Sequence, residues 1–381
     1  MLYSRRDFLK CTFCFLASFF SDSWAKTIYF RKGLIKTKVS PYFKKLDNKS
    51  IMCTLCPRFC VVADGKRGYC EVRENRGGIY YSLVYGNPCA VHIDPIEKKP
   101  FFHVLPGTSA FSIATAGCNF DCKFCQNWEI SQARPEETFN YDLPPEEVVA
   151  LAKIYKCSSI ASTYVEPMIF YEYMYDIGRL LKEEDILNTC HSNGFINPEP
   201  LRALCKYLDA ACIDLKGFSE KFYEELTEGK LAPVLRTLKI LRKEGVHTEI
   251  VNLIVPTKND DFKMIKEMVE WIKTELGDDV PLHFTRFYPR YKLNNLPPTP
   301  IDTLEKARSI ALKAGLKYVY IGNVPGHPAE NTYCPKCDEV LIRRIGYRIE
   351  AIYLKDGKCG YCGFPIPGIW SKKKQKQGKQ V

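Results

Sequence analysis

The middle of the chain alternates between two kinds of hydrophobic pattern. Short apolar runs rich in Ile, Val and Tyr recur along it, and such runs predict buried strands. Longer stretches that mix charged and apolar residues separate them and are typical of helices. The predicted strands are 111–116, 159–164, 186–191, 210–215, 248–255, 281–287 and 318–322. One predicted helix opens at Pro144-Pro145-Glu146-Glu147, and the others span 169–183, 231–244, 260–275 and 303–314.

This strand–helix alternation predicts parallel βα units. We expect an α/β fold in which residues 111–325 form a partial (β/α)6-type TIM barrel, with its chemistry at the carboxyl ends of the strands. A Cys-rich N-terminal module is expected at 51–110 and a zinc-ribbon-like unit at 326–370. Residues 26–50 are predicted to be a basic linker, and residues 371–381 a basic disordered tail.

The charge is concentrated at the two ends. The net charge is +11, but residues 1–50 hold eleven Lys and Arg against three Asp and Glu, and the last ten residues hold five Lys and no acid. The body is therefore close to neutral. A groove for nucleic acid needs a basic surface, so we expect no nucleic-acid partner.

The first residues resemble an export signal. Ser4-Arg5-Arg6-Asp7-Phe8-Leu9-Lys10 matches the twin-arginine signal, and the apolar stretch Cys11–Phe20 follows it. That stretch is short for a bilayer, which needs about 20 residues, and fits a signal segment. Residues 1–25 are thus predicted to direct the chain to the twin-arginine translocon, for export or tethering. The alternatives are a chance basic start and a cytoplasmic protein.

The 18 cysteines fall mostly in clusters, and the central one is Cys118, Cys122 and Cys125 in C-x3-C-x2-C spacing. Three thiolates can hold three irons of a [4Fe–4S] cluster and leave the fourth iron open. With Phe124 before the third Cys, the loop resembles the radical S-adenosylmethionine (SAM) signature. The resemblance implies that SAM binds the open iron, is cleaved by one electron and yields a 5′-deoxyadenosyl radical. The alternatives are a zinc site and an electron-transfer cluster that borrows a fourth Cys.

Polar residues at other predicted strand ends fit the same resemblance. Glu166 stands where the superfamily has an acid that meets the SAM amino group, although the usual glycines are absent; the alternative is a carboxylate at a helix start. Ser192 and Asn193 belong to a turn similar to the Thr-Asn-Gly turn of glycyl-radical activating enzymes. Asn252 lies where ribose contacts are usual. These four residues are the predicted cofactor contacts.

Asp214 and Lys216 end the fourth predicted strand. Being two residues apart, they project to the same face. They resemble the Asp-x-Lys of the activating enzymes, which implies a catalytic role, and a structural ion pair is the alternative.

Two further groups of cysteines flank the barrel. Cys53, Cys56, Cys60 and Cys70 precede it and predict a Zn²⁺ site or an auxiliary iron–sulfur cluster, or disulfides if the protein is exported. The pairs Cys334-x2-Cys337 and Cys359-x2-Cys362 follow it. This spacing is typical of a structural zinc ribbon, and a rubredoxin-like iron is the other option.

Longer blocks resemble one family, the radical SAM enzymes of the AmmeMemoRadiSam system, over about residues 51–370. The blocks are Cys53–Cys60, Gly68–Arg73, Asp94–Pro100, Gln126–Gln132, Tyr164–Tyr173 and Gly326–Thr332. That family is similar to pyruvate formate-lyase activating enzymes and accompanies Memo-type and AMMECR-type proteins, which the resemblance implies as partners. Two features depart from the family or its relatives: the leader, and extra cysteines placed before the central loop.

The leading hypothesis is a radical SAM enzyme that abstracts hydrogen from a protein or small molecule. Its electron donor would be a ferredoxin or flavodoxin. The alternatives are a glycyl-radical-enzyme activase, a non-catalytic iron–sulfur electron carrier and a zinc-stabilised binding module. The substrate does not follow from the resemblance.

Overall fold

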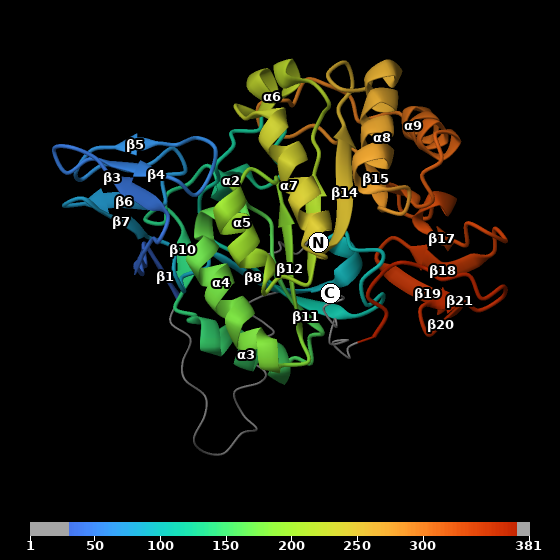
Figure 1. Ribbon diagram of the computed structural model, residues 1–381, viewed down its shortest axis with the longest axis horizontal. Coiled ribbons are helices and arrows are strands. Elements are labelled where there is room, and N and C mark those ends of the chain that lie inside the picture. The colour runs from blue at the N-terminus through green and yellow to red at the C-terminus, as the bar shows by residue number, and fades with distance from the viewer. Residues whose placement is uncertain (1–29, 372–381) are drawn as a thin grey trace, which may run out of the picture.

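The computed structural model describes residues 30–371, and its centre is a sheet of eight strands in the order β16-β15-β14-β13-β12-β11-β9-β8 (Figure 1). Neighbouring strands are parallel, except that β8 pairs antiparallel with β9. The predicted α/β class with a mostly parallel sheet is thereby confirmed. The strands are β8 Ala90–Pro95, β9 Ser109–Ala114, β11 Ser159–Ser162, β12 Leu187–Ser192, β13 Ala210–Asp214, β14 His247–Ile254, β15 Leu282–Arg286 and β16 Val319–Gly322.

Helices connect the parallel strands, as the amphipathic pattern predicts. In α8 the buried residues Ile265, Met268, Val269 and Ile272 follow helical spacing, and the Asp261 side chain caps the helix by accepting from the Lys263 and Met264 amides. The helices are α2 Trp128–Ser131, α3 Pro145–Ile154, α4 Tyr171–Leu180, α5 Pro198–Cys205, α6 Glu220–Thr227, α7 Leu231–Lys243, α8 Phe262–Leu276 and α9 Ile301–Lys313. Short 3-10 turns lie at η1 Ile96–Lys98, η2 Pro167–Phe170, η3 Leu181–Glu183 and η4 Pro328–Glu330. Within residues 30–371, none of the helices has the length and apolar content to cross a membrane.

The two faces of the sheet bury different partners. One face packs against the helices in the largest core cluster. The other face contributes small or aliphatic residues, one or two from each of five strands, to a second cluster: Ala110, Ala161, Leu187, Ala210, Cys212 and Val251. The segment between β8 and β9 completes that cluster with Ile96, Phe101, Val104 and Leu105. This segment therefore fills the inner side of the barrel near the amino ends of its strands.

The N-terminal module is made of short antiparallel strands. They are β2 Lys38–Val39, β3 Phe43–Lys45, β4 Ile51–Cys53, β5 Val61–Val62, β6 Arg73–Arg76 and β7 Ile79–Ser82, in the sheets β2-β7-β6 and β3-β4-β5. A further strand, β1 Phe30–Lys32, pairs with β10 Phe139–Tyr141. Within the described part of the predicted basic linker, β1, β2 and β3 pair with β10, β7 and β4.

The C-terminal unit packs against the amino ends of the barrel strands, on the opposite side of Figure 1 from the N-terminal module. Its strands are β17 Thr332–Tyr333, β18 Val340–Ile345, β19 Arg348–Ile352, β20 Leu354–Lys355 and β21 Lys358–Cys359. Leu105 N donates to Ile369 O at 2.8 Å, and Arg344 Nη2 donates to Phe102 O at 2.8 Å. Phe102, Tyr318 and Tyr320 share a core cluster with the unit's Leu341 and Ile342.

His103, buried at this junction, makes stability depend on pH. Its Nδ1 lies 2.6 Å from Pro367 O and its Nε2 2.6 Å from Tyr320 Oη. A carbonyl can only accept, so Nδ1 donates and the neutral Nε2 accepts. Burial lowers the pKa of His103 to about 3, and Glu249, His247 and Arg344 are the charged or titratable groups that also act on it.

The unfolded chain therefore takes up this proton first as the pH falls below about 6.5. Going from pH 7 to pH 5 should cost about 2 kcal/mol of unfolding free energy through His103. Urea unfolding at pH 7 and pH 5 should show a smaller loss of unfolding free energy in His103→Gln than in the native protein. Titratable groups that the two proteins share contribute equally to both losses and cancel in the comparison. Equal losses in both proteins would contradict the assignment.

Candidate functional site

The central cysteine loop begins directly after β9, at the carboxyl end of the sheet. Gly117 makes the turn with φ of +90°. A Cβ there would lie 2.6 Å from Cys70 O and 2.5 Å from Val72 Cγ1, so only glycine fits where the N-terminal module presses on the loop. Gly117 N donates to Ile130 O at 2.9 Å. The loop is therefore held between the N-terminal module and α2.

Contacts from the end of α6 and from the turn after β12 fix the course of the loop. Asp121 N donates to Thr227 O at 3.1 Å, and Lys123 N donates to Leu226 O at 2.9 Å, both at the end of α6. Asn119 Nδ2 donates to Phe195 O at 3.0 Å. These partners are more than 70 residues away along the chain, so the loop is rigid only in the folded barrel.

The three thiols of the loop fit an iron–sulfur cluster by their chemistry. Cys118, Cys122 and Cys125 are all outside disulfides, and Cys122 is buried. Burial raises the pKa of Cys118, and raises that of Cys122 to about 12 against the opposing charge of Lys216. Without a metal the two thiols stay protonated, whereas a metal that coordinates a thiol deprotonates it. Three soft donors in one partly buried loop match a cluster with one open iron.

Glu166 ties the neighbouring strand ends together. Its Oε1 accepts from Met168 N at 3.0 Å and Ser192 Oγ at 2.7 Å, and its Oε2 accepts from Asn193 N at 2.7 Å. Burial raises the pKa of Glu166 to about 7, although these hydrogen bonds oppose the shift. In the structure Glu166 is both a cap of η2 and an anchor of the Ser192–Asn193 turn, and its contact with SAM stays a prediction.

Asn193 carries this network to the cysteine loop. Its Nδ2 donates to Asn119 Oδ1 at 2.8 Å, and Asn119 lies between Cys118 and Cys122. Sequence reasoning placed Glu166, Ser192 and Asn193 near one another, and the structure brings all three together. It missed Asn119, whose only sequence signal is its position inside the cysteine motif.

Asp214 and Lys216 form an ion pair at the end of β13, at 2.8 Å. His191 Nε2 lies 2.9 Å from Asp214 Oδ1, from the adjacent strand β12. Burial opposes the ionisation of Asp214, but Lys216 and His191 hold its pKa below the usual range. Lys216 Nζ also lies 5.8 Å from the centre of the Phe124 ring. The pairing is as the ion-pair alternative predicts, and a catalytic role for the two residues remains a prediction.

Asn252 lies on β14 and contacts the chain between Asp214 and Lys216. On β14 it alternates with Val251, which belongs to the cluster on the inner side of the sheet, whereas its neighbours Ile250 and Ile254 pack with the helices. Asn252 Nδ2 donates to Leu215 O at 2.7 Å, and its buried Oδ1 finds no hydrogen-bond partner among residues 30–371. The structure therefore shows Asn252 supporting the loop after β13, and its predicted cofactor contact is not tested.

The two flanking cysteine groups differ in geometry. At the C-terminal end, the Sγ atoms of Cys334 and Cys362 are 3.6 Å apart and those of Cys337 and Cys359 are 3.7 Å apart. Four thiolates about 2.3 Å from one ion in a tetrahedron lie about 3.8 Å apart. This tetrad thus has the spacing of a site for a single metal ion, as predicted, and both zinc and iron fit it.

The N-terminal group surrounds a space instead. Cys53, Cys56, Cys60 and Cys70 all line one cavity, together with Arg58, Arg73, Asn119 and other residues. None of the four is in a disulfide. Burial raises the pKa of Cys53, and raises that of Cys70 to about 12.

Comparisons with known proteins agree with this geometry. A family model described as the radical SAM superfamily matches residues 112–272. The uncharacterized protein MJ0808 of Methanocaldococcus jannaschii is 47% identical over 327 residues, which cover 85% of this chain and 97% of that protein. A putative glycyl-radical enzyme activating enzyme of the same organism, MJ1632, is 26% identical over 56% of this chain and 78% of its own length. The pyruvate formate-lyase-activating enzyme of Listeria monocytogenes is 24% identical over 47% of this chain and 77% of its own length.

Proposed function

The chain belongs to the radical SAM superfamily, and from that membership we propose that it cleaves SAM reductively and abstracts a hydrogen atom from a protein or small-molecule substrate. The observation that carries the proposal is the loop with Cys118, Cys122 and Cys125, held at the carboxyl end of β9 beside the ends of β11, β12 and β13. When bound, a [4Fe–4S] cluster and SAM supply a one-electron cleavage and a 5′-deoxyadenosyl radical. The protein supplies binding, orientation and exclusion of water.

The residues around the loop have separable tasks in this proposal. The three thiolates would hold three irons of the cluster. Lys216 offsets the negative charge that the thiolates bring into a buried place, since its charge already favours the Cys122 thiolate. Glu166 and Asn193 keep the adjacent turn in place, so that its polar edge faces the site. Asp214 fixes Lys216 by the ion pair and leaves its ammonium one defined position.

The test is SAM cleavage by the full chain after anaerobic reconstitution with iron and sulfide. We expect an EPR signal of the reduced cluster that changes when SAM is added, and formation of 5′-deoxyadenosine with dithionite. A fully loaded protein that shows neither would overturn the proposal and favour a non-catalytic electron carrier. We propose that metal analysis of the same sample will find about one zinc ion per chain, bound at the C-terminal tetrad.

A second candidate is favoured by the relatives named as activating enzymes. In that case the substrate is a backbone glycine of a partner enzyme. Incubation with pyruvate formate-lyase and SAM would then produce a glycyl-radical EPR signal, and its absence beside active SAM cleavage would favour a different substrate.

A further inference from the structure

We propose that Cys53, Cys56, Cys60 and Cys70 hold a second iron–sulfur cluster, fully ligated by protein thiolates, which passes electrons to the site at Cys118–Cys125. The relay role rests on the proposed function, whereas the cluster itself does not.

The first argument is the shape of the thiol cage. All four thiols line one cavity, whereas the C-terminal sulfur atoms contact each other at 3.6 Å and 3.7 Å. Across residues 30–371, only the C-terminal tetrad has three or more candidate ligand atoms that all lie within 4.8 Å of one another. A single ion needs close sulfurs, but in a multi-iron cluster each thiolate binds a different iron and the sulfurs stand farther apart.

The second argument is that the surrounding chain keeps the cage open. Backbone bonds shape its loops, with Cys53 N donating to Cys60 O at 2.9 Å. Gly68 forms part of the wall, and a Cβ there would lie 2.5 Å from Tyr80 Oη and 3.7 Å from Cys60 Cβ. A larger residue would therefore push into the cage. The absence of a disulfide among four neighbouring cysteines agrees with metal ligation.

The third argument is charge. A cluster with four thiolates carries net negative charge, which is costly in a buried place without a compensating cation. Arg73 lines the cavity, where it is also paired with the buried carboxylate of Glu172. Arg58 lines the cavity as well. The cage thus has two guanidinium groups in its wall.

The fourth argument is the contact between the two cysteine sites. Asn119, within the central loop, lines the N-terminal cavity, and Arg58 Nε donates to Asn119 O at 2.7 Å. Cys70 O lies against Gly117, directly before Cys118. The two sites are therefore separated by little more than one layer of backbone, which suits transfer of an electron.

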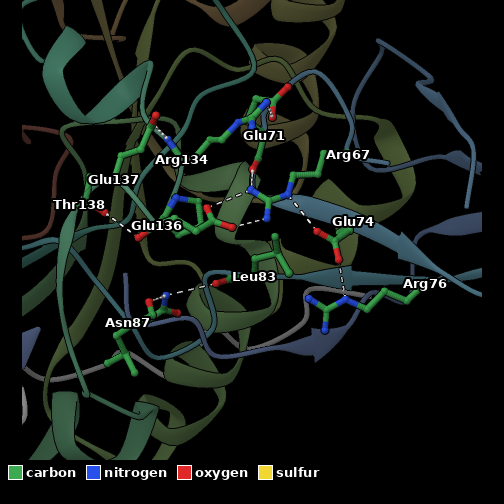
Figure 2. A network of polar contacts seen from close by, with 12 residues as sticks. Arg67, Glu71, Glu74, Arg76, Leu83, Asn87, Arg134, Glu136, Glu137 and Thr138 are labelled. Carbon is green, nitrogen blue, oxygen red and sulfur yellow. Dashed lines mark hydrogen bonds and ion pairs between the residues drawn. The ribbon is translucent and has the colours of Figure 1, made fainter. Parts of the chain in front are cut away.

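A polar network keeps the Cys70 turn in register with the chain that follows the central loop. Figure 2 shows Arg67 between Glu74 and Glu136, and Arg134 beside Glu71. Arg67 Nη1 lies 3.0 Å from Glu136 Oε2, and Arg134 Nη2 lies 2.9 Å from Glu71 Oε2.

The relay step needs no bond change: a one-electron carrier protein reduces the cluster, and the same electron then leaves for the Cys118–Cys125 site.

The decisive sample is the triple variant Cys118→Ala, Cys122→Ala, Cys125→Ala of the full chain, reconstituted anaerobically. It should retain about four iron and four sulfide per chain and give an EPR signal that SAM does not change. Zinc without sulfide at this site, or no iron above the amount bound by the C-terminal tetrad, would overturn the proposal. Because the N-terminal cysteines are intact in this variant, the result does not depend on how well their removal is tolerated.

The relay is tested in the double variant Cys53→Ala, Cys70→Ala, with Cys205→Ala on α5 as the matched control. With reduced ferredoxin as donor, we expect the SAM-responsive signal to appear at least tenfold more slowly in the double variant than in the control. An equal rate would contradict the relay, but it would not affect the iron and sulfide content measured in the triple variant. Failure of the proposed function looks different: the native chain would then carry both clusters and cleave no SAM.

Discussion

Replacing Cys122 by alanine is expected to lower 5′-deoxyadenosine formation by at least about 100-fold, which exceeds the 10–100-fold loss typical when a residue behind a metal ligand is changed. Cys122 is buried and offers one of three thiols of the loop. With two thiolates left, two irons would lack protein ligands, and the cofactor that does the chemistry would be incomplete.

The measurement is the yield of 5′-deoxyadenosine per chain with dithionite, together with the iron count. Cys157→Ala is the matched control, since Cys157 is also buried but lies just before β11 and outside every cysteine group. We expect that control to keep its iron and most of its activity. A Cys122→Ala protein with an unchanged SAM-responsive signal would show that this thiol is not a ligand.

Replacing Arg73 by methionine is expected to cost about 3–5 kcal/mol of unfolding free energy, because it leaves a buried carboxylate unpaired. The side chains of Arg73 and Glu172 are 1% and 5% exposed, and their two hydrogen bonds measure 2.8 Å and 2.5 Å. Arg73 Nε also donates to Ile169 O at 3.1 Å. The pair joins β6 of the N-terminal module to α4 of the barrel.

Urea unfolding at equal iron content measures the loss, because Arg73 also faces the N-terminal cysteines. The double variant Arg73→Met, Glu172→Leu should recover most of the stability, since replacing both partners of a buried pair by apolar residues is often nearly neutral. Arg76→Met is the exposed control, with a side chain 47% exposed, and should change stability by less than about 0.5 kcal/mol. A small loss in Arg73→Met would mean that water reaches Glu172.

The barrel could be predicted because its strands are apolar runs with a local signal. The predicted strand 210–215 became β13 Ala210–Asp214, and 318–322 became β16 Val319–Gly322. The helices α5 and α6 were not predicted, since each has only eight residues and little room for a periodic pattern. The edge strand β8 was missed as well, because five of its six residues are at least partly exposed and only its antiparallel pairing with β9 makes it a strand.

The candidate site, like the fold, could be predicted only in part from the sequence. The cysteine spacing and the rule that parallel strands end at one edge were enough to bring Glu166, Ser192 and Asn193 beside the loop. His191 is the last residue of the predicted strand 186–191, and its bond to Asp214 depends on the adjacency of β12 and β13. Arg58 gave no signal, because its partners are backbone carbonyls 61 and 170 residues away. Side-chain partners of this kind depend on the folded arrangement and leave no pattern in the sequence.

The junction between Phe102, His103 and the last described strands bears on how this enzyme can be divided. Ile369 N donates to His103 O and Leu105 N donates to Ile369 O, both at 2.8 Å, so the chain returns to the barrel after the C-terminal unit. A truncation after residue 325 would uncover Phe102, Tyr318 and Tyr320, three aromatic side chains at most 5% exposed, and newly exposed apolar patches favour aggregation. The barrel and the C-terminal unit therefore form one folding unit, and a shortened barrel would be a poor starting point for biochemistry.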